Sequence, residues 1–507
     1  MDLKSAYDKV QWHLLWQLLQ RLGVHGSMLG AVQSLYDGCL LSMRVGGACG
    51  GSHSPSVGLR QGCPLSATLF GIFIDGLHHH LQTTCPEAGV RLQSLRLTDL
   101  VYADDICLMA SSPAHLQALI DALAAFCATL HMEVSVLKTK VMVVSASPTS
   151  STNFTCNGQS VDEVQSFKYL GLHFHASGSI SHLIRPLKAK AERAWAIVQQ
   201  RHSQLQCGDT VNFKLQLLQS ILVPSVHYGC ELWGMHSPKT PMVNKARTSL
   251  EQVYARLLRR VCGVRPNTPA DMLLTELGLT CLKVFWWRRT LQFFNELASS
   301  PPDSLYHIIL LDNQRDAFQL RVSNFCRSIF QELAAVGYHM SQDVAAVSRL
   351  DVTAIMDLLQ GSLQSANASE LVCPRVAPSA GVVSCTYHQW FLPLSKRRRY
   401  CQLPVSGRRM QRFLQFRLGS HSLPIATGRF AGGQHLVRSD RVCSHCGGVS
   451  IADELHVVFE CPALALVRQR YAGLFTPATD SMRSFFGQGS HMQVFKFILE
   501  CLDFLEV

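Results

Sequence analysis

Residues 97–110 read Leu-Thr-Asp-Leu-Val-Tyr-Ala-Asp-Asp-Ile-Cys-Leu-Met-Ala, with Tyr102-Ala103-Asp104-Asp105 at the centre. Apolar residues lie on both sides of two adjacent acids, a pattern that predicts a β-hairpin with the acids at its tip. Ionised carboxylates in an apolar setting are costly unless they meet a cation or a substrate. The stretch therefore predicts a site for divalent cations, which prefer oxygen ligands. The alternative is an ordinary tight turn, where Asp is common for backbone reasons.

Two predicted helices flank this hairpin in the sequence. Every fourth residue of the first is apolar, which predicts one helix with a buried stripe formed by Leu65, Leu69, Phe73, Leu77 and Leu81. The second is predicted to begin at Ser112 and Pro113, a cap residue followed by proline at the first helical position. Beyond residue 180 the pattern is almost wholly helical. The chain is therefore predicted to be α+β.

Four further motifs accompany the hairpin in a fixed order. Upstream of it lie Asp2-Leu-Lys-Ser-Ala-Tyr7-Asp8 and Gly58-Leu-Arg-Gln61-Gly62-Cys-Pro, and downstream lie Lys138-Thr-Lys-Val and Phe167-Lys-Tyr-Leu-Gly-Leu172. Together the five resemble palm motifs A to E of LINE-type (non-LTR) retrotransposon reverse transcriptases. The resemblance implies an antiparallel palm sheet with helices, then a mostly helical thumb and C-terminal region with a small zinc knuckle.

The resemblance also implies catalytic roles. Asp2 and Asp104 match the carboxylates that hold two Mg²⁺ ions, and Asp105 matches an adjacent, less essential carboxylate. Such ions, about 3.5 to 4 Å apart, suit an in-line displacement by a primer 3′-hydroxyl. Lys138 matches a proton donor to the leaving pyrophosphate, although an ordinary surface lysine is the alternative.

Further residues match positions that bind the substrate. Tyr7 matches the aromatic residue beneath the incoming sugar, whose ring collides with a 2′-hydroxyl. A core aromatic residue is the alternative for Tyr7. Gln61 and Gly62 match a loop that contacts the nucleotide and the template base, and Tyr102 lies beside the metal carboxylates.

Near the C-terminus, Cys443, Cys446, His456 and Cys461 form the pattern C-x₂-C-x₉-H-x₄-C. Two thiolates separated by two residues, followed by a distant His/Cys pair, suit a tetrahedral zinc site. Four protein ligands close the site, so the predicted zinc is structural. His445 is a competing ligand with poorer spacing.

The positive charge is concentrated just before this motif. Residues 373–442 contain twelve Lys or Arg residues and one acid, Asp440, whereas the whole chain has a net charge of +11. A local field of this kind suits a polyanion, and aromatic residues interleaved with the charges suit base stacking. The predicted nucleic-acid contacts are Lys396, Arg397, Arg398, Arg399, Arg408 and Arg409, with Arg412, Phe413, Phe416 and Arg417 in the same interleaved segment. A nuclear-localisation signal and a solvated basic face remain alternatives.

The composition bounds the class of protein. At 47% hydrophobic and 16% charged residues, the chain is globular. An odd number of scattered cysteines, 19, favours reduced thiols. No apolar run reaches the roughly 18 residues needed to span a bilayer, so we expect no membrane partner and a nuclear or cytoplasmic location.

The sequence predicts four domains. These are a palm at 1–172, a thumb and helical extension at 173–300, a helical region with a linker at 301–394, and a basic segment with the zinc module at 395–507.

The predicted function is an RNA-directed DNA polymerase that uses an RNA template, a DNA primer or target and deoxynucleoside triphosphates. Because Asp2 follows Met1 directly, we expect the fingers to be missing, the Asp2 end to fray and activity to be weak or absent. An inactive nucleic-acid-binding remnant is therefore the alternative. The zinc motif and residues 167–172 disfavour a third interpretation, a group II intron maturase.

Overall fold

The structure is a computed structural model that describes residues 1–92, 95–144, 153–205, 210–236, 249–319, 324–339, 347–371, 399–428, 436–448, 450–488 and 490–506. The chain divides into two compact units. Unit 1 comprises Met1–His182 and Pro302–Asp312, and unit 2 comprises Leu183–Pro301 and Asn313–Val507. The finer division into four domains remains a prediction.

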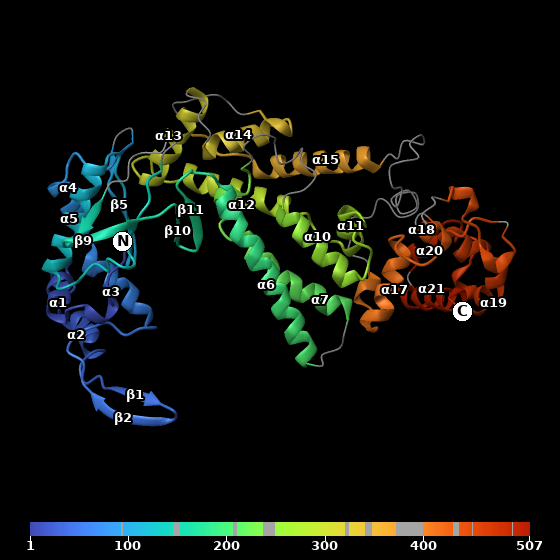
Figure 1. Ribbon diagram of the computed structural model, residues 1–507, viewed down its shortest axis with the longest axis horizontal. Helices are drawn as coiled ribbons and strands as arrows, with labels where there is room; N and C mark the ends of the chain where they lie inside the picture. The colour runs from blue at the N-terminus through green and yellow to red at the C-terminus, as the bar shows by residue number, and fades with distance from the viewer. Residues whose placement is uncertain are drawn as a thin grey trace. The chain divides into compact units, whose positions relative to one another are not determined.

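Unit 1 is mixed α and β, as predicted (Figure 1). Its elements are η1 (Tyr7–Lys9), α1 (Trp12–Arg21), α2 (Gly26–Ser34), β1 (Leu41–Val45), β2 (Ala48–His53), α3 (Pro64–Ile74), α4 (Gly76–Thr84), β3 (Val90–Arg91), β4 (Arg96–Leu97), β5 (Asp99–Tyr102), β6 (Asp105–Leu108), α5 (Pro113–Thr129), β7 (Lys140–Val141), β8 (Phe154–Cys156), β9 (Gln159–Glu163), β10 (Ser166–Tyr169) and β11 (Leu172–His175). α13 (Leu305–Gln319) is divided between the two units.

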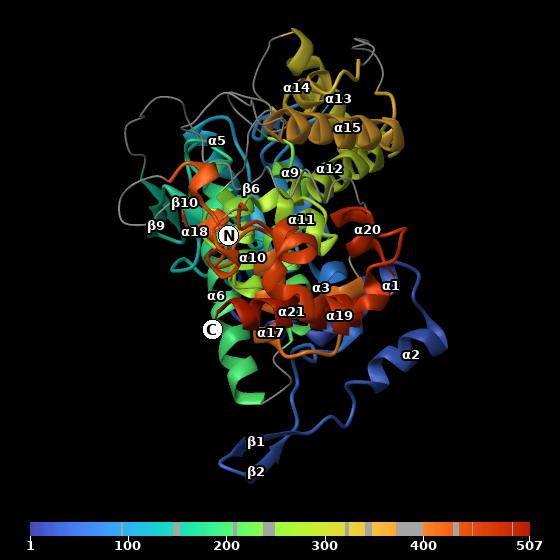
Figure 2. The ribbon, with the colours of Figure 1, turned by 90° about the vertical axis from the view of Figure 1, so that its right-hand side faces the viewer.

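The strands of unit 1 form small sheets. Four are antiparallel pairs, β1–β2, β3–β4, β5–β6 and β10–β11, and the fifth has the order β7–β9–β8. β7 pairs with β9 in parallel, a detail that the predicted antiparallel palm did not include. The β1–β2 hairpin extends away from the helices α1 and α3 (Figure 1; Figure 2).

The predicted helices are present, with one correction. α5 begins at Pro113, and the Ser112 side chain accepts a hydrogen bond from His115 N, as the cap pattern predicted. The single helix predicted for residues 65–81 is two helices, α3 and α4, separated at Asp75. The apolar stripe nevertheless continues across the break, because Asp75 keeps right-handed helical backbone angles and Leu77 and Leu81 remain buried.

The expected fraying at Asp2 is wrong in the structure. The extended segment Met1–Leu3, called the Asp2 strand below although it lies outside the numbered strands, is hydrogen-bonded on one side to β6. There, Met1 N donates to Ile106 O at 2.7 Å and Ile106 N donates to Met1 O at 3.2 Å. On the other side, Leu3 bridges to Val134, and Ser135 N donates to Asp2 O at 2.8 Å. Main-chain hydrogen bonds on both sides therefore fix the strand.

The loop before α3 pairs with the turn that follows Asp2. Leu59 N donates to Tyr7 O at 2.7 Å, and Gly58 N donates to Val10 O at 2.9 Å. Gly58 has φ +94°, and a Cβ there would lie 2.9 Å from Asp8 O. Because only glycine fits both the backbone angle and the space, this position joins the two motif loops.

Unit 2 is helical. Its elements are α6 (Ser181–Leu205), α7 (Val211–Leu217), η2 (Leu218–Leu222), α8 (Val223–His227), α9 (Cys230–Trp233), α10 (Ser249–Cys262), α11 (Ala270–Leu277), α12 (Leu282–Ala298), α14 (Phe325–Ala335), α15 (Val352–Leu371), η4 (Arg399–Gln402), α17 (Gly407–Arg417), α18 (Pro424–Thr427), η6 (Arg438–Asp440), η7 (Ser444–Cys446), η8 (His456–Glu460), η9 (Pro462–Leu464), α19 (Ala465–Arg470), η10 (Ala472–Leu474), α20 (Met482–Gly487) and α21 (His491–Leu505). Across the described ranges, no helix is long and apolar enough to cross a membrane.

α17 connects the C-terminal module to the helices before it. Gln411 Nε2 donates to Val261 O at 3.0 Å, at the end of α10. Arg417 forms a buried ion pair with Glu276 of α11, and its Nη2 donates to Glu276 Oε2 at 3.0 Å. The Arg417 guanidinium also lies over the Phe486 ring at 4.4 Å. These contacts join α17 to helices far from it in the sequence. α17, α10 and α11 all belong to unit 2.

We predict that Gly58→Ala destabilises unit 1 by about 1–3 kcal/mol, because alanine disfavours φ +94° and its Cβ would contact Asp8 O. Hydrogen exchange of the full chain, read by mass spectrometry, should show faster exchange in residues 7–11 and 57–61. Gly71→Ala is the matched control. Gly71 lies inside α3, and a Cβ added there would meet no heavy atom within 4 Å, so alanine should stabilise by about 0.5–1 kcal/mol. Equal exchange in the parent and Gly58→Ala would contradict this account.

Candidate active site and metal centre

The two adjacent acids lie on the hairpin that the sequence predicted. β5 and β6 pair antiparallel, with Tyr102 opposite Asp105, so Ala103 and Asp104 form the turn. Ala103 has φ +54°, in the left-handed region that residues with a side chain rarely adopt. A strained backbone angle at a turn that carries a candidate catalytic acid is typical of functional sites.

A third acid, Asp99, anchors the base of this hairpin, and our sequence reasoning missed it. Asp99 is buried, accepts a hydrogen bond from Thr98 Oγ1 at 2.6 Å, and lies 2.8 Å from His78 Nδ1 of α4. The position of Asp99 among apolar strand residues could have indicated its role, because a buried carboxylate requires hydrogen-bond partners. These contacts tie β5 to α4 and give Asp99 a structural role.

Asp2 presents one carboxylate oxygen that has no hydrogen-bond donor. Asp2 Oδ1 is buried without a hydrogen bond among the described residues. Lys138 Nζ lies 3.3 Å from this oxygen, an ion pair whose geometry is not that of a hydrogen bond. A buried carboxylate oxygen that already faces a cation is a suitable ligand for a divalent metal ion. Asp2 therefore fits the implied metal.

Asp104 and Asp105 act on different neighbours. Burial raises the pKa of Tyr7, and the Asp104 charge raises it further. Burial, then Cys107 and Asp105, raise the pKa of Tyr169 in β10. The Asp104 charge thus acts on Tyr7, whereas the Asp105 charge acts on Tyr169.

The predicted substrate-binding residues lie around the same loops. Tyr7 stacks on Phe70 of α3 with ring centroids 4.8 Å apart and remains partly exposed. Gln61 is exposed, and Tyr102 is 66% exposed, so both side chains are accessible to a ligand. Gly62 has φ +85° and no heavy atom within 4 Å of an added Cβ. Its backbone angle, together with the open space beside it, accounts for glycine there.

One cavity of unit 1 lies apart from the candidate catalytic acids. It has a volume of about 670 Å³ and is lined mainly by apolar residues of β6, β7, β10 and β11, including Leu108, Val141, Phe167 and Phe174. Asp2, Asp104 and Asp105 do not line this cavity. This cavity is therefore separate from the candidate site around Asp2 and Asp104.

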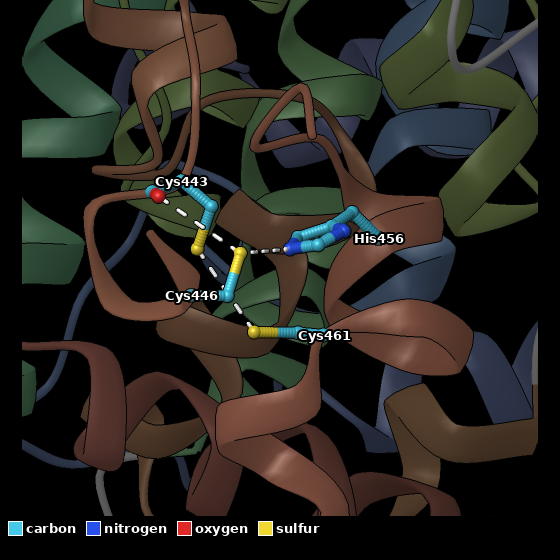
Figure 3. A group of neighbouring side chains, drawn as sticks. All are labelled: Cys443, Cys446, His456 and Cys461. Carbon is cyan, nitrogen blue, oxygen red and sulfur yellow. Dashed lines mark hydrogen bonds between the residues drawn. The ribbon is translucent and has the colours of Figure 1, made fainter. Parts of the chain in front are cut away.

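The zinc motif forms one compact cluster (Figure 3). The ligand atoms of Cys443, Cys446, His456 and Cys461 all lie within 4.8 Å of one another. Cys443 Sγ lies 3.9 Å from Cys461 Sγ, and Cys446 Sγ lies 3.4 Å from His456 Nε2. Zn–S bonds of about 2.3 Å in a tetrahedron imply S···S separations of about 3.8 Å, so the spacing fits. Within the described ranges, no other group of three His, Cys, Asp or Glu residues, including the palm acids, is this compact.

Neighbouring groups orient the zinc ligands. His456 Nδ1 lies 3.4 Å from Glu460 Oε2, and His456 N donates to Asp453 Oδ1 at 3.0 Å. A carboxylate on the second ring nitrogen fixes the tautomer that presents Nε2 to a metal. The competing ligand, His445, lies outside the cluster, with its ring centroid 6.3 Å from that of Phe504.

Two thiols of the cluster, Cys446 and Cys461, have raised pKa values in the metal-free protein. Burial raises the pKa of the Cys461 thiol to about 11. Burial, followed by the nearby Cys443, also raises the pKa of Cys446. A bound divalent cation has the opposite effect and deprotonates a coordinating thiol.

The basic segment separates into exposed and buried residues. Arg408 and Arg409 are exposed on the first turn of α17, as a nucleic-acid contact requires. The interpretation of residues 412–417 as a surface for phosphates and bases is wrong. Arg412 pairs with Asp503 and Glu506, whereas Phe413, Phe416 and Arg417 are buried. Their charge–aromatic pattern reflects the core of unit 2.

Part of the predicted nucleic-acid surface is not covered by the structure. Lys396, Arg397 and Arg398 lie outside the described residues, and Arg399 begins η4. Their contact with nucleic acid remains a prediction.

Comparisons with known proteins agree with this geometry. Residues 1–174 match the family described as reverse transcriptase (RNA-dependent DNA polymerase). The chain is 26% identical over 325 residues to the retrovirus-related Pol polyprotein from type-1 retrotransposable element R2 of Popillia japonica, covering 60% of this chain and 42% of the relative. It is 24% identical over 189 residues to the corresponding polyprotein from element R2DM of Drosophila melanogaster, covering 36% and 18%.

A third relative comes from another element. The chain is 22% identical over 341 residues to the RNA-directed DNA polymerase from mobile element jockey of Drosophila funebris, covering 62% of this chain and 34% of the relative. The chain thus spans less than half the length of these three relatives. The resemblance predicted from the motifs is confirmed: residues 1–174 match the reverse transcriptase family, and these three relatives are proteins of non-LTR retrotransposons.

Proposed function

We propose that the chain carries the polymerase centre of an RNA-directed DNA polymerase of a non-LTR retrotransposon. Its substrates would be an RNA template, a DNA primer or target and deoxynucleoside triphosphates. The observation that carries the proposal is the buried, donor-free Asp2 Oδ1 beside a cation, on a strand paired with the hairpin of Asp104. The family match implies nucleic-acid and nucleotide partners and divalent metal ions.

The proposed chemistry depends on positioning and charge. Asp2 and Asp104 would hold Mg²⁺, which when bound lowers the pKa of the primer 3′-hydroxyl and neutralises the leaving pyrophosphate. Asp105, the first residue of β6, would contribute further negative charge beside Asp104. Tyr7, supported by Phe70, would exclude a 2′-hydroxyl sterically.

Lys138 is suited to move a proton. Its side chain is 69% exposed, and its Nζ lies 3.3 Å from Asp2 Oδ1 in the structure. Because a metal ion at Asp2 repels an ammonium group, Lys138 would then point into solvent, where a pyrophosphate can accept its proton.

We propose that the C-terminal cluster binds a structural zinc and that the exposed arginines of α17 contact nucleic-acid phosphates. Four closely spaced protein ligands leave no open position for a reacting group. A nuclear or cytoplasmic location also remains part of the proposal.

We predict that Asp104→Ala lowers Mg²⁺-dependent extension of a poly(rA)/oligo(dT) primer–template by at least about 10²-fold, because an electrostatic element of the reaction is lost. Asp162→Ala is the matched control, since Asp162 is an exposed acid of unit 1 that pairs with Lys140 at 2.6 Å. It should extend primers like the parent. Extension by Asp104→Ala at the parent rate would sink the assignment of the active centre. Nucleic-acid binding without extension in the parent would favour the non-enzymatic alternative.

We predict about one zinc ion per full chain, measured by metal analysis after dialysis. Cys446→Ser and Cys461→Ser should each lose the metal and lower the thermal midpoint, because metal binding contributes folding free energy. The control is Cys49→Ser, which removes an exposed thiol outside the cluster. Below half an equivalent in the parent, or equal zinc in all variants, the structural zinc site is refuted.

We predict that the double variant Arg408→Gln/Arg409→Gln weakens RNA and DNA binding alike. The slope of log affinity against log salt should become shallower by about two if both residues contact phosphate. Arg412→Gln is the control on the same helix, because Arg412 already pairs with Asp503 and Glu506. An unchanged slope in the double variant would remove these two arginines from the interface.

A further inference from the structure

The Asp8 carboxylate lies on turn η1, next to Tyr7, and joins the two motif loops of unit 1. Asp8 Oδ1 accepts a hydrogen bond from Gln61 Nε2 at 3.1 Å. We propose that Asp8 is a positioning residue, an inference that rests on the proposed polymerase function. It fixes the Gln61 amide so that the Gln61 carbonyl oxygen faces the incoming nucleotide as a hydrogen-bond acceptor.

The chemistry of the pair determines the orientation of the amide. An ionised carboxylate only accepts hydrogen bonds, whereas the Gln side chain has a donor end and an acceptor end. Asp8 therefore selects the NH₂ end of Gln61 and leaves the carbonyl oxygen turned away. That oxygen can accept from the sugar hydroxyl of the nucleotide, a donor that every deoxynucleoside triphosphate carries.

The backbone beneath Asp8 is held firmly enough to perform this role. Asp8 N and Lys9 N both donate to Ser5 O, at 3.0 and 3.1 Å. Ser5 itself has φ +47°, a left-handed angle that turns the chain from the Asp2 strand into η1. Gly58 packs directly against the Asp8 main chain, with no room for a side chain between them.

The pair also completes a row of contacts between the two loops. Gln11 bridges to Val57, Gly58 N donates to Val10 O, and Leu59 N donates to Tyr7 O. The Gln61–Asp8 hydrogen bond continues this row beyond the main-chain contacts, through side chains. Asp8 lies next in sequence to Tyr7, the residue proposed to lie beneath the sugar of the incoming nucleotide.

Stability alone does not account for this contact. Both side chains are exposed, and exposed polar pairs contribute little to folding. Removing the carboxylate should therefore leave the fold intact and free the Gln61 amide to rotate. The expected effect is on nucleotide binding.

The test measures nucleotide KM and kcat in primer extension by the full chain, with Mg²⁺·dTTP on poly(rA)/oligo(dT). A second readout is equilibrium binding of a fluorescent dTTP analogue to the chain with Mg²⁺ and primer–template. Asp8→Ala should raise KM and weaken binding by about fivefold, with kcat nearly unchanged. Asp8→Asn, whose amide can donate as well as accept, should restore only part of the affinity, because it no longer selects one orientation of the Gln61 amide.

A double-mutant cycle separates orientation from packing. If Asp8 acts through Gln61, Asp8→Ala should have no further effect on KM in a Gln61→Ala background. Glu87→Ala is the matched control, because Glu87 is an exposed acid of unit 1 that pairs with Arg96 at 2.9 Å. It should leave KM and binding unchanged.

The possible outcomes separate a failure of this inference from a failure of the proposed polymerase function. Parent-like KM and binding in Asp8→Ala, or equal effects with and without Gln61, would overturn the positioning role. If Asp104→Ala still abolishes extension in that case, the proposed function stands. A parent that neither extends primers nor binds the nucleotide would overturn both.

Discussion

The geometry of the candidate active site depends on the strand of Asp2, which is hydrogen-bonded on both sides. β6 pairs with it at Met1, and residues 133–135 pair with it at Asp2 and Leu3. This double pairing fixes the Asp2 backbone and buries one of its carboxylate oxygens without a donor. Leaving a buried charged oxygen unpaired is costly, so the fold favours a cation there. Lys138 supplies one at 3.3 Å in the structure.

The same pairing brings the hairpin of Asp104 and Asp105 to the Asp2 strand, because β6 is hydrogen-bonded to Met1. Burial raises the pKa of Tyr7 and of Tyr169, and the Asp104 charge adds to the first effect whereas the Asp105 charge adds to the second. The two adjacent acids of the YADD sequence therefore act on different tyrosines.

Local signals in the sequence predicted much of this fold. The hairpin, the Ser112 cap of α5 and the spacing of the zinc ligands depend on neighbours close in sequence, and all three are present. Contacts between distant residues could not be predicted. The roles of Asp99 and Asp8 depend on His78 and Gln61, and the roles of Arg412 and Arg417 depend on acids of α21 and α11. A charge run does not reveal which of its members already have partners inside the fold.

The two candidate metal centres differ in ligand type and in exposure, and these differences separate their roles. The zinc cluster has sulfur and nitrogen ligands, largely buried, at spacings that fill a tetrahedron. A site closed in this way can stabilise structure but cannot admit a substrate. The palm acids form no such compact group and are bordered by the exposed Tyr102 and Lys138. A metal ion there would keep open positions for the oxygens of a nucleotide and a primer. Of the two candidate centres, the less complete one is thus the one suited to catalysis, because substrates can supply the missing ligands.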